Sequence, residues 1–261
     1  MQHLIFHYVF IMKIMHNHKR AKMKNAKHLL VIFLCVGITV CADGQFRRTI
    51  TGNHNVVRET RSTNSFTGVK VSAGIDIYLT QGNKISVVVE ADENLHEYIM
   101  TEVRDNILNV YTDANIRSAE RKRVYVSMKD IYSVRTTSAG DVIGETPVKT
   151  DELKLSASSA GDIKLEVYAD NVLVNVSSSG DITLDGEAET LDATLSSAGD
   201  LKASNFKVKE ADVSVSSAGD ASVYVTEKLN ARASSAGDIY YRGDPKYIDA
   251  RSSSAGGIHR R

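Results

Sequence analysis

The chain has 261 residues, of which 42% are hydrophobic and 25% charged, and its 32 basic side chains match its 32 acidic ones. This apolar content is too high for an intrinsically disordered chain, and two cysteines are too few for a disulfide scaffold. The balanced charge predicts no strongly acidic or basic partner, so function has to be inferred from the order of the residues.

An uncharged apolar run lies near the N-terminus, where residues 29–40 have the sequence LLVIFLCVGITV. The run is short for a bilayer span, but basic residues precede it and small residues follow it, as in a secretory signal peptide. We therefore expect residues 1–42 to be a signal peptide, with residues 1–22 as an over-long start or an extended n-region. The protein is then exported, to the periplasm, the outer-membrane surface or the extracellular space.

Residues 43–261 are expected to form a single domain. Loss of residues 1–42 removes both cysteines and five of the eight histidines, which argues against a zinc-type metal site. It also removes six basic residues and no acidic ones, so the remaining net charge is 32 − 6 − 32 = −6. Cys41 closes the apolar run and is a candidate lipid acceptor, although Val40 is bulky for such a site. Membrane association is expected only if Cys41 is lipidated.

A phrase close to Ser-Ser-Ala-Gly-Asp recurs along the second half of the chain. Counting back nine, seven and five residues from its aspartate gives apolar side chains, such as Leu153, Leu155 and Ala157 before Asp162. A second alternating segment follows each corner. Both patterns are typical of strands with one buried face. The glycines of the phrase are 18 to 21 residues apart: Gly140, Gly161, Gly180, Gly199, Gly219, Gly237 and Gly256.

These features predict an all-β fold, a parallel β-helix or β-solenoid with about 19 residues per coil, right-handed by the crossover rule. The regular repeats cover residues 132–258, and a less regular β region covers residues 45–135. At each corner we expect glycine to supply the positive φ of a sharp bend. Serine hydroxyls and the aspartate carboxylate are expected to bond turn amides.

The less regular region carries the same pattern in weaker form. Residues 69–79 predict an early coil whose corner, at residues 72–76, has one extra residue. Residues 93–103 predict one or two helical turns, and residues 107–111 and 124–128 predict strands.

With these phrases in place, the chain resembles the GIN-domain family, described as putative auto-transporter adhesin head domains of exported bacterial proteins. The matching stretches are residues 69–81 (VKVSAGIDIYLTQ), residues 87–95 (VVVEADENL), residues 124–128 and the Ser-Ala-Gly-Asp corners, in the expected order. The resemblance covers nearly all of residues 50–258. It implies an exported β-solenoid of unestablished biochemical function, and it supplies no catalytic residues.

Stacked corners would align six aspartates along one edge, a column that offers hard oxygen ligands to Ca²⁺. However, carboxylates about 5 Å apart in water repel by only about 1 kcal/mol before salt screening, so the column can stand without a cation. We therefore favour turn capping, keep Ca²⁺ as the alternative and expect no other cofactor. The six residues are Asp141, Asp162, Asp181, Asp200, Asp220 and Asp238.

A column of serines and a set of acidic residues suggest catalysis less strongly. A nucleophilic serine needs a base, and no histidine lies between His96 and His259. The serines concerned are Ser159, Ser178, Ser197, Ser217 and Ser235. A polysaccharide-active enzyme needs paired carboxylates, but the candidates fall at unequal offsets and are typical of a solvated face. These candidates are Asp151, Glu152, Asp170, Glu187 and Glu189.

A basic cluster, made of Arg117, Arg121, Lys122 and Arg123, fits a solvated loop better than a phosphate or acidic-glycan site. The sequence has no stripe of basic and aromatic residues, so we expect no nucleic-acid partner. We therefore expect a non-catalytic cell-envelope or surface solenoid that acts as an adhesin-like module and binds a glycan or a surface protein. The first alternative is a structural protein whose solenoids associate end to end or through an edge into larger assemblies. The second is a polysaccharide-active enzyme.

Overall fold

The computed structural model describes residues 48–261, so the predicted signal peptide and Cys41 lie outside the described residues. No helix within this range has the length and apolar character that a membrane span requires. The described chain consists of strands and one short 3-10 helix, Glu93–Leu95. The strands are β1 Thr49–Thr51, β2 Val56–Arg61, β3 Gly68–Val71, β4 Asp76–Gln81, β5 Ser86–Asp92, β6 Ile99–Arg104, β7 Ile107–Thr112, β8 Asn115–Ser118, β9 Lys122–Met128, β10 Ser133–Thr136, β11 Asp141–Gly144, β12 Val148–Ser158, β13 Asp162–Ser177, β14 Asp181–Leu195, β15 Asp200–Val215, β16 Asp220–Ala233, β17 Asp238–Arg242, β18 Tyr247–Ser252 and β19 Gly257–Arg260.

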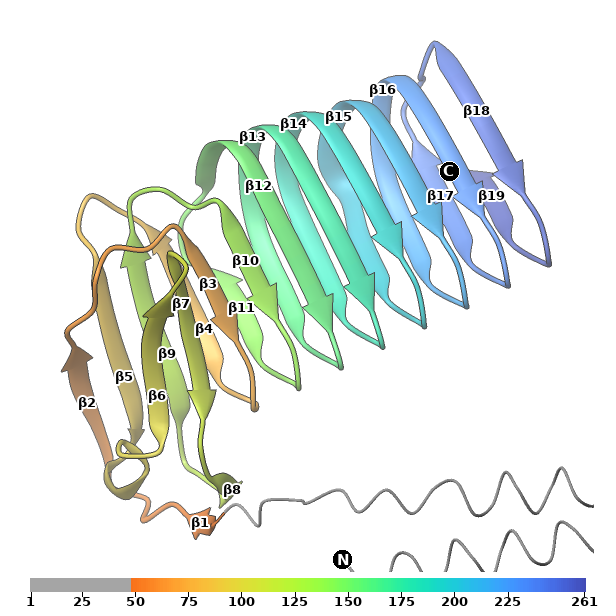
Figure 1. Cartoon of the computed structure of the whole chain (residues 1–261). Helices are drawn as coiled ribbons and strands as arrows, with labels where there is room; N and C mark the ends of the chain where they lie inside the picture. Colours follow the sequence, from red (N-terminus) through yellow and green to blue (C-terminus); the bar gives the residue numbers. More distant parts are fainter. Residues whose placement is uncertain (1–47) are drawn as a thin grey trace, which may run out of the picture. The chain divides into compact units, whose positions relative to one another are not determined.

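The regular part is a β-solenoid, which confirms the predicted fold class. Each coil leaves a tight Ser-Ala-Gly corner along one sheet, rounds a broad bend and returns along a second sheet to the next corner (Figure 1). Strands β13 to β16 pass round the bend without a break. Neighbouring coils pair in parallel, for example from Asp162 opposite Asp181 to Val176 opposite Leu195. The handedness of the coil stays a prediction.

The hydrophobic core lies between the two sheets. Because parallel strands stack in register, the apolar position nine residues before each corner aspartate forms one continuous inner column. None of its five members from β12 to β16 is more than 3% exposed, and they are Leu153, Val172, Leu191, Ala211 and Leu229. The period-two pattern of the sequence therefore identifies the core correctly.

The N-terminal part closes one end of the solenoid. Strands β3 and β4 form an early coil that stacks on β10 and β11, and β7 and β9 stack on its other side. Antiparallel strands then cover this end, with β6 on β7 and with β5 and β2 beside β9. The helical turns predicted for residues 93–103 are therefore mostly wrong, because β6 is recruited as the end strand of one sheet.

The corner of the early coil has the same length as the later corners, so the predicted extra residue is wrong. Val71 pairs with Thr136 and Asp76 with Asp141, which leaves four residues between them in both coils. Ile75 occupies the place of the glycine and is fully buried.

The corner glycines do not supply the positive φ that we expected of them. In the corner that ends at Gly180, the positive φ values belong to Ser178 (52°) and Ser179 (59°), and the Gly180 amide donates to the Ser177 carbonyl oxygen at 3.1 Å. This is the geometry of a type I′ turn. A Cβ on Gly180 would lie 2.7 Å from the Ala157 carbonyl carbon, so the glycine is needed where one coil meets the next.

The corner residues with positive φ continue the backbone hydrogen bonds between coils through the corner. The Ser179 amide donates to the Ser197 carbonyl oxygen of the next coil at 3.1 Å, and the Ala160 amide donates to the Ser178 carbonyl oxygen at 3.1 Å. The peptide groups of the turn thus point along the solenoid axis. Backbone groups that a tight turn would leave unpaired are satisfied by the neighbouring coils.

Candidate binding groove

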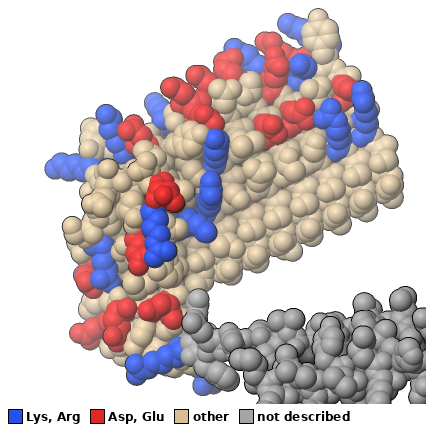
Figure 2. Space-filling model, in the orientation of Figure 1, with Lys and Arg blue, Asp and Glu red and all other residues tan. Residues whose placement is uncertain are grey.

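A shallow groove of about 820 Å³ runs along the bend edge, on the side of the solenoid opposite the corners. Figure 2 shows Lys, Arg, Asp and Glu side chains gathered over this edge, whereas the row of corners presents mainly uncharged residues on the visible face. The groove is lined by residues of five successive strands, β12 to β16. It therefore crosses the strands and follows the direction in which the coils stack.

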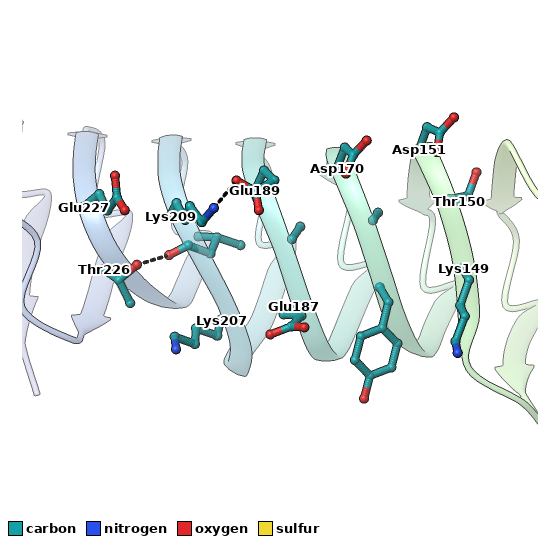
Figure 3. A pocket seen from close by; sticks show the side chains of 14 residues that line it. Lys149, Thr150, Asp151, Asp170, Glu187, Glu189, Lys207, Lys209, Thr226 and Glu227 are labelled. Atoms are coloured by element: carbon teal, nitrogen blue, oxygen red, sulfur yellow. Dashed lines mark hydrogen bonds and ion pairs between the residues drawn. The ribbon is translucent and has the colours of Figure 1, made fainter.

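Two columns of side chains form the walls of the groove (Figure 3). Strand pairing places one column in register, because Lys149 lies opposite Tyr168, Tyr168 opposite Glu187 and Glu187 opposite Lys207. Each residue of the second column lies eleven positions before the aspartate of the following corner. Its members are Asp151, Asp170, Glu189, Lys209 and Glu227.

Small apolar side chains form the floor between the walls. Ala169 pairs with Ala188 and Ala188 with Val208, and Ala188 and Val208 are 8% and 1% exposed. Thr226 follows Val225, the partner of Val208, and its hydroxyl donates to the Val208 carbonyl oxygen at 3.1 Å. Successive side chains of a strand point to opposite faces. The floor is low because its residues point inward, whereas the larger residues before and after them point outward on either side of the row.

The walls carry both signs of charge but have more carboxylates than lysines. Lys209 forms an ion pair with Glu189 at 2.6 Å, and this contact raises the pKa of Lys209. The Tyr168 hydroxyl donates to Glu166 at 2.8 Å, which raises the pKa of Tyr168. The ring of Tyr168 is 37% exposed beside the floor. The groove can thus donate and accept hydrogen bonds while offering one aromatic and several small apolar surfaces.

The acidic residues predicted to form a solvated face on the returns are all exposed. Asp151, Asp170, Glu187 and Glu189 all line the groove, in the two columns described above. Their offsets are unequal because Glu187 belongs to the column thirteen residues before the next corner aspartate, whereas the other three belong to the column eleven residues before it. Only Glu152 lies outside, where it forms an ion pair with Lys154 at 3.1 Å.

The predicted aspartate column is present and is longer than the six residues named from the sequence. Asp76 pairs with Asp141 at one end, and Gly257 takes the aspartate position after Asp238 at the other. The extra member was missed because Ile75 obscures the corner phrase before it. All six predicted residues stand in register: Asp141, Asp162, Asp181, Asp200, Asp220 and Asp238.

Two carboxylates of this column accept amides of the next coil, where turn amides of their own corner were expected. Asp141 accepts from the Asp162 amide at 3.3 Å, and Asp200 accepts from the Asp220 amide at 3.2 Å. Burial raises the pKa of Asp162, and the neighbouring carboxylates of Asp141 and Asp181 raise it further. Lys202 forms an ion pair with Asp181 at 2.6 Å. Within residues 48–261, no group of three or more His, Cys, Asp or Glu residues is arranged to hold a metal ion.

The serine column lies at the corners as predicted. Ser159, Ser178, Ser197, Ser217 and Ser235 all have positive φ values between 52° and 56°. Their carbonyl oxygens accept hydrogen bonds from amides of the preceding coil, so the backbone of these serines links neighbouring coils.

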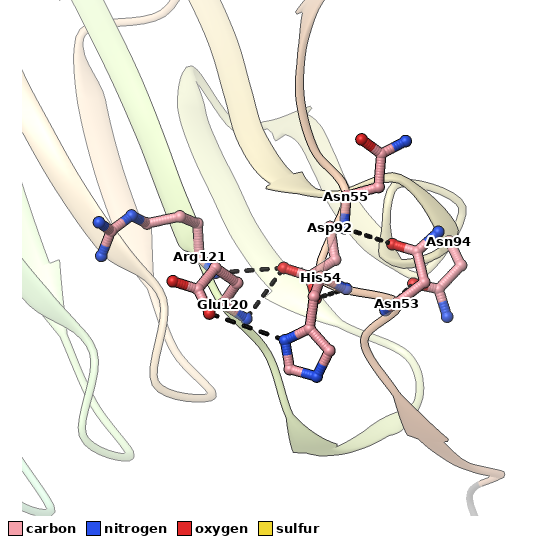
Figure 4. A network of polar contacts seen from close by, with 7 residues as sticks. All are labelled: Asn53, His54, Asn55, Asp92, Asn94, Glu120 and Arg121. Carbon is pink, nitrogen blue, oxygen red and sulfur yellow. Dashed lines mark hydrogen bonds and ion pairs between the residues drawn. The ribbon is translucent and has the colours of Figure 1, made fainter.

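The predicted basic cluster does not form one patch. Lys122 is partly buried with its amine 3.4 Å from the Ala73 carbonyl oxygen, and the Arg123 guanidinium lies 5.5 Å from the centre of the Tyr78 ring. Arg117 is exposed on β8. The guanidinium of Arg121 extends away from the network around Asp92 (Figure 4).

Asp92 ties the loops at the closed end together. It is fully buried, and its carboxylate accepts the amides of His54 at 3.0 Å, Glu120 at 2.9 Å and Arg121 at 3.2 Å (Figure 4). Three amide donors compensate a buried carboxylate, so this network has a structural explanation.

Comparisons with known proteins agree with this architecture. The family model described as "Putative auto-transporter adhesin, head GIN domain" matches residues 65–245. The fold is similar to that of a putative adhesin from Bacteroides fragilis, with a TM-score of 0.76 and 20% identity over 81% of this chain and 100% of that one. A putative lipid binding protein from Parabacteroides distasonis has a TM-score of 0.68 and 23% identity over 82% and 100% of the two chains. A putative adhesin from Parabacteroides merdae has a TM-score of 0.67 and 21% identity over 82% and 99%. No curated protein matches the chain.

Proposed function

Because the chain belongs to the family of putative auto-transporter adhesins with a head GIN domain, we propose that it is an exported, non-catalytic binding module that holds a glycan chain in the bend-edge groove. The family description is that of an adhesin and names no enzymatic activity. The observation that carries the choice of surface is the groove itself, which crosses five successive strands and presents aligned polar walls over an apolar floor.

The repeat of the groove favours an extended ligand with a repeating unit. Successive coils are about 4.8 Å apart, which is close to the length of one pyranose residue in an extended polysaccharide. Each sugar would therefore meet the same pair of wall positions as the previous one. A compact ligand would use only one or two of the coils.

The chemistry of the lining favours a neutral glycan over an acidic one. Carboxylates accept hydrogen bonds from sugar hydroxyls, and Lys149 and Lys207 donate to hydroxyl or ring oxygens. Tyr168, Ala169 and Ala188 offer apolar surface to the ring faces. Carboxylates outnumber lysines along the groove, and Asp151, Asp170 and Glu187 form no ion pair with another described residue, so the groove would repel a polyanion.

Binding should first be measured by applying the purified protein to an array of neutral, acidic and amino-sugar oligosaccharides, followed by calorimetry on the best ligand. We expect a neutral oligosaccharide to bind, and we expect Tyr168→Ala to weaken binding at least about tenfold, equivalent to about 1.4 kcal/mol. Binding should persist in a chelator, since no cation takes part in the proposal.

A matched control is available in the segment between β9 and β10. Tyr132 is 41% exposed, close to the 37% of Tyr168, but lies outside the groove. Tyr132→Ala should leave the affinity unchanged. A blank array would contradict the proposal, as would equal losses in the two tyrosine variants.

A further inference from the structure

The C-terminal end of the solenoid is open. Within residues 48–261, β18 pairs only with β16 and β19 only with β17, so each strand has one edge with no partner strand. Ile248 continues the inner column of Leu229 but is 47% exposed, whereas Leu229 is fully buried. Tyr247 beside it is 72% exposed. Among the residues that the structure describes, none covers the cross-section of the hydrophobic core at this end.

The opposite end of the solenoid shows what a covered end looks like. There the antiparallel strands and the short 3-10 helix cover the core, and Val89, Ala91, Leu95 and Ile99 are at most 2% exposed. An exposed six-residue strand edge that carries some apolar side chains, such as Tyr247 and Ile248, can template pairing with another strand. The residues of β18 indicate which strand it suits.

The edge strand β18 is self-complementary in charge. Asp249 and Arg251 both lie on its outer face, where a bidentate contact of 2.9 Å joins them within one chain. Antiparallel pairing of two copies of β18 about Ala250 places Asp249 of each copy opposite Arg251 of the other. The same register puts Ala250 opposite Ala250 and Ile248 opposite Ser252 on the inner face.

We propose that two copies of the chain associate through their β18 edges in a closed two-fold dimer. The two open cores then face each other, and the unpaired backbone groups of β18 form an antiparallel ladder across the interface. Because a two-fold contact uses the same patch on both copies, the assembly stops at two subunits and does not grow into a filament. The surface is distinct from the bend-edge groove, so the dimer and the proposed glycan binding stand or fall separately.

The test uses charge reversal on the purified protein, with light scattering and sedimentation over a dilution series. Wild type should be a dimer that dissociates on dilution. Asp249→Arg gives β18 two positive charges and Arg251→Asp gives it two negative charges, so each variant should self-associate at least about tenfold more weakly. An equimolar mixture of the two variants should form a one-to-one heterodimer, because the opposite charges then meet again.

Both substitutions are at exposed positions whose ion pair contributes little to folding, and circular dichroism with thermal unfolding should show native variants. A wild type that is monomeric at every concentration would overturn the proposal. A dimer that ignores both substitutions, a mixture of variants that fails to associate, or oligomers that grow beyond two subunits would overturn it equally.

Discussion

At the scale of single residues, the corners divide two requirements between neighbours. Positive φ falls on serine and alanine, residues for which the left-handed region costs roughly 1 kcal/mol, while glycine stands one position later with an ordinary φ. Glycine is placed there because a Cβ would collide with the backbone of the preceding coil. A sequence motif shows that a glycine is needed, but it does not show whether φ or space requires it.

Two adjacent substitutions in one corner separate these requirements. Ser179→Gly removes the strain of a positive φ at an exposed position and should raise the free energy of unfolding by up to about 1 kcal/mol. Gly180→Ala places a Cβ 2.7 to 2.8 Å from backbone atoms of Ala157 and Ser158 and should lower it by about 1–3 kcal/mol. Denaturant titrations measure both changes. The interpretation fails if Gly180→Ala is neutral or if Ser179→Gly is the more harmful change.

At the scale of the element, the aspartate column holds carboxylates that repel one another in a single row. The pKa of Asp162 is raised in the folded state, so this carboxylate binds a proton more readily in the folded protein than in the unfolded chain. Stability therefore falls as pH rises from the unfolded pKa, about 3.9, through the folded pKa. We expect Asp162→Asn to melt above wild type at pH 7 and low salt, and the two melting temperatures to converge below about pH 3.9.

Salt and calcium distinguish the explanations for this column. Added NaCl should reduce the advantage of Asp162→Asn, because it screens the repulsion from Asp141 and Asp181. CaCl₂ at matched ionic strength should do no more than NaCl, since a bound ion would stabilise wild type selectively by mass action. A calcium-specific rise in the melting temperature of wild type would favour the alternative of a cation site. A variant that melts below wild type at pH 7 would show that the carboxylate is required.

At the scale of the whole molecule, the sequence predicts whatever repeats in step with the corners. Counting back from Asp162 or Asp181 finds the buried column because strand pairing keeps that offset constant. The same count extended to eleven and thirteen residues would have found the groove walls, since Asp170 and Tyr168 precede Asp181 by those distances. The closed end was less predictable because the strand character of β6 comes from pairing with β7, which no local pattern encodes.

A modular solenoid should tolerate the loss of a whole coil but not of part of one. Deleting residues 181–199 joins Gly180 to Asp200 and lets β13 pair with β15 in the existing register, so the shortened protein should fold cooperatively with lower stability. It should also lose the Glu187 and Glu189 wall positions and bind a shorter glycan. Deleting residues 181–190 breaks the register between core and solvent faces and should abolish folding. Far-ultraviolet circular dichroism and thermal unfolding of both deletions test this, and equal damage from the two would show that the coils do not behave as independent units.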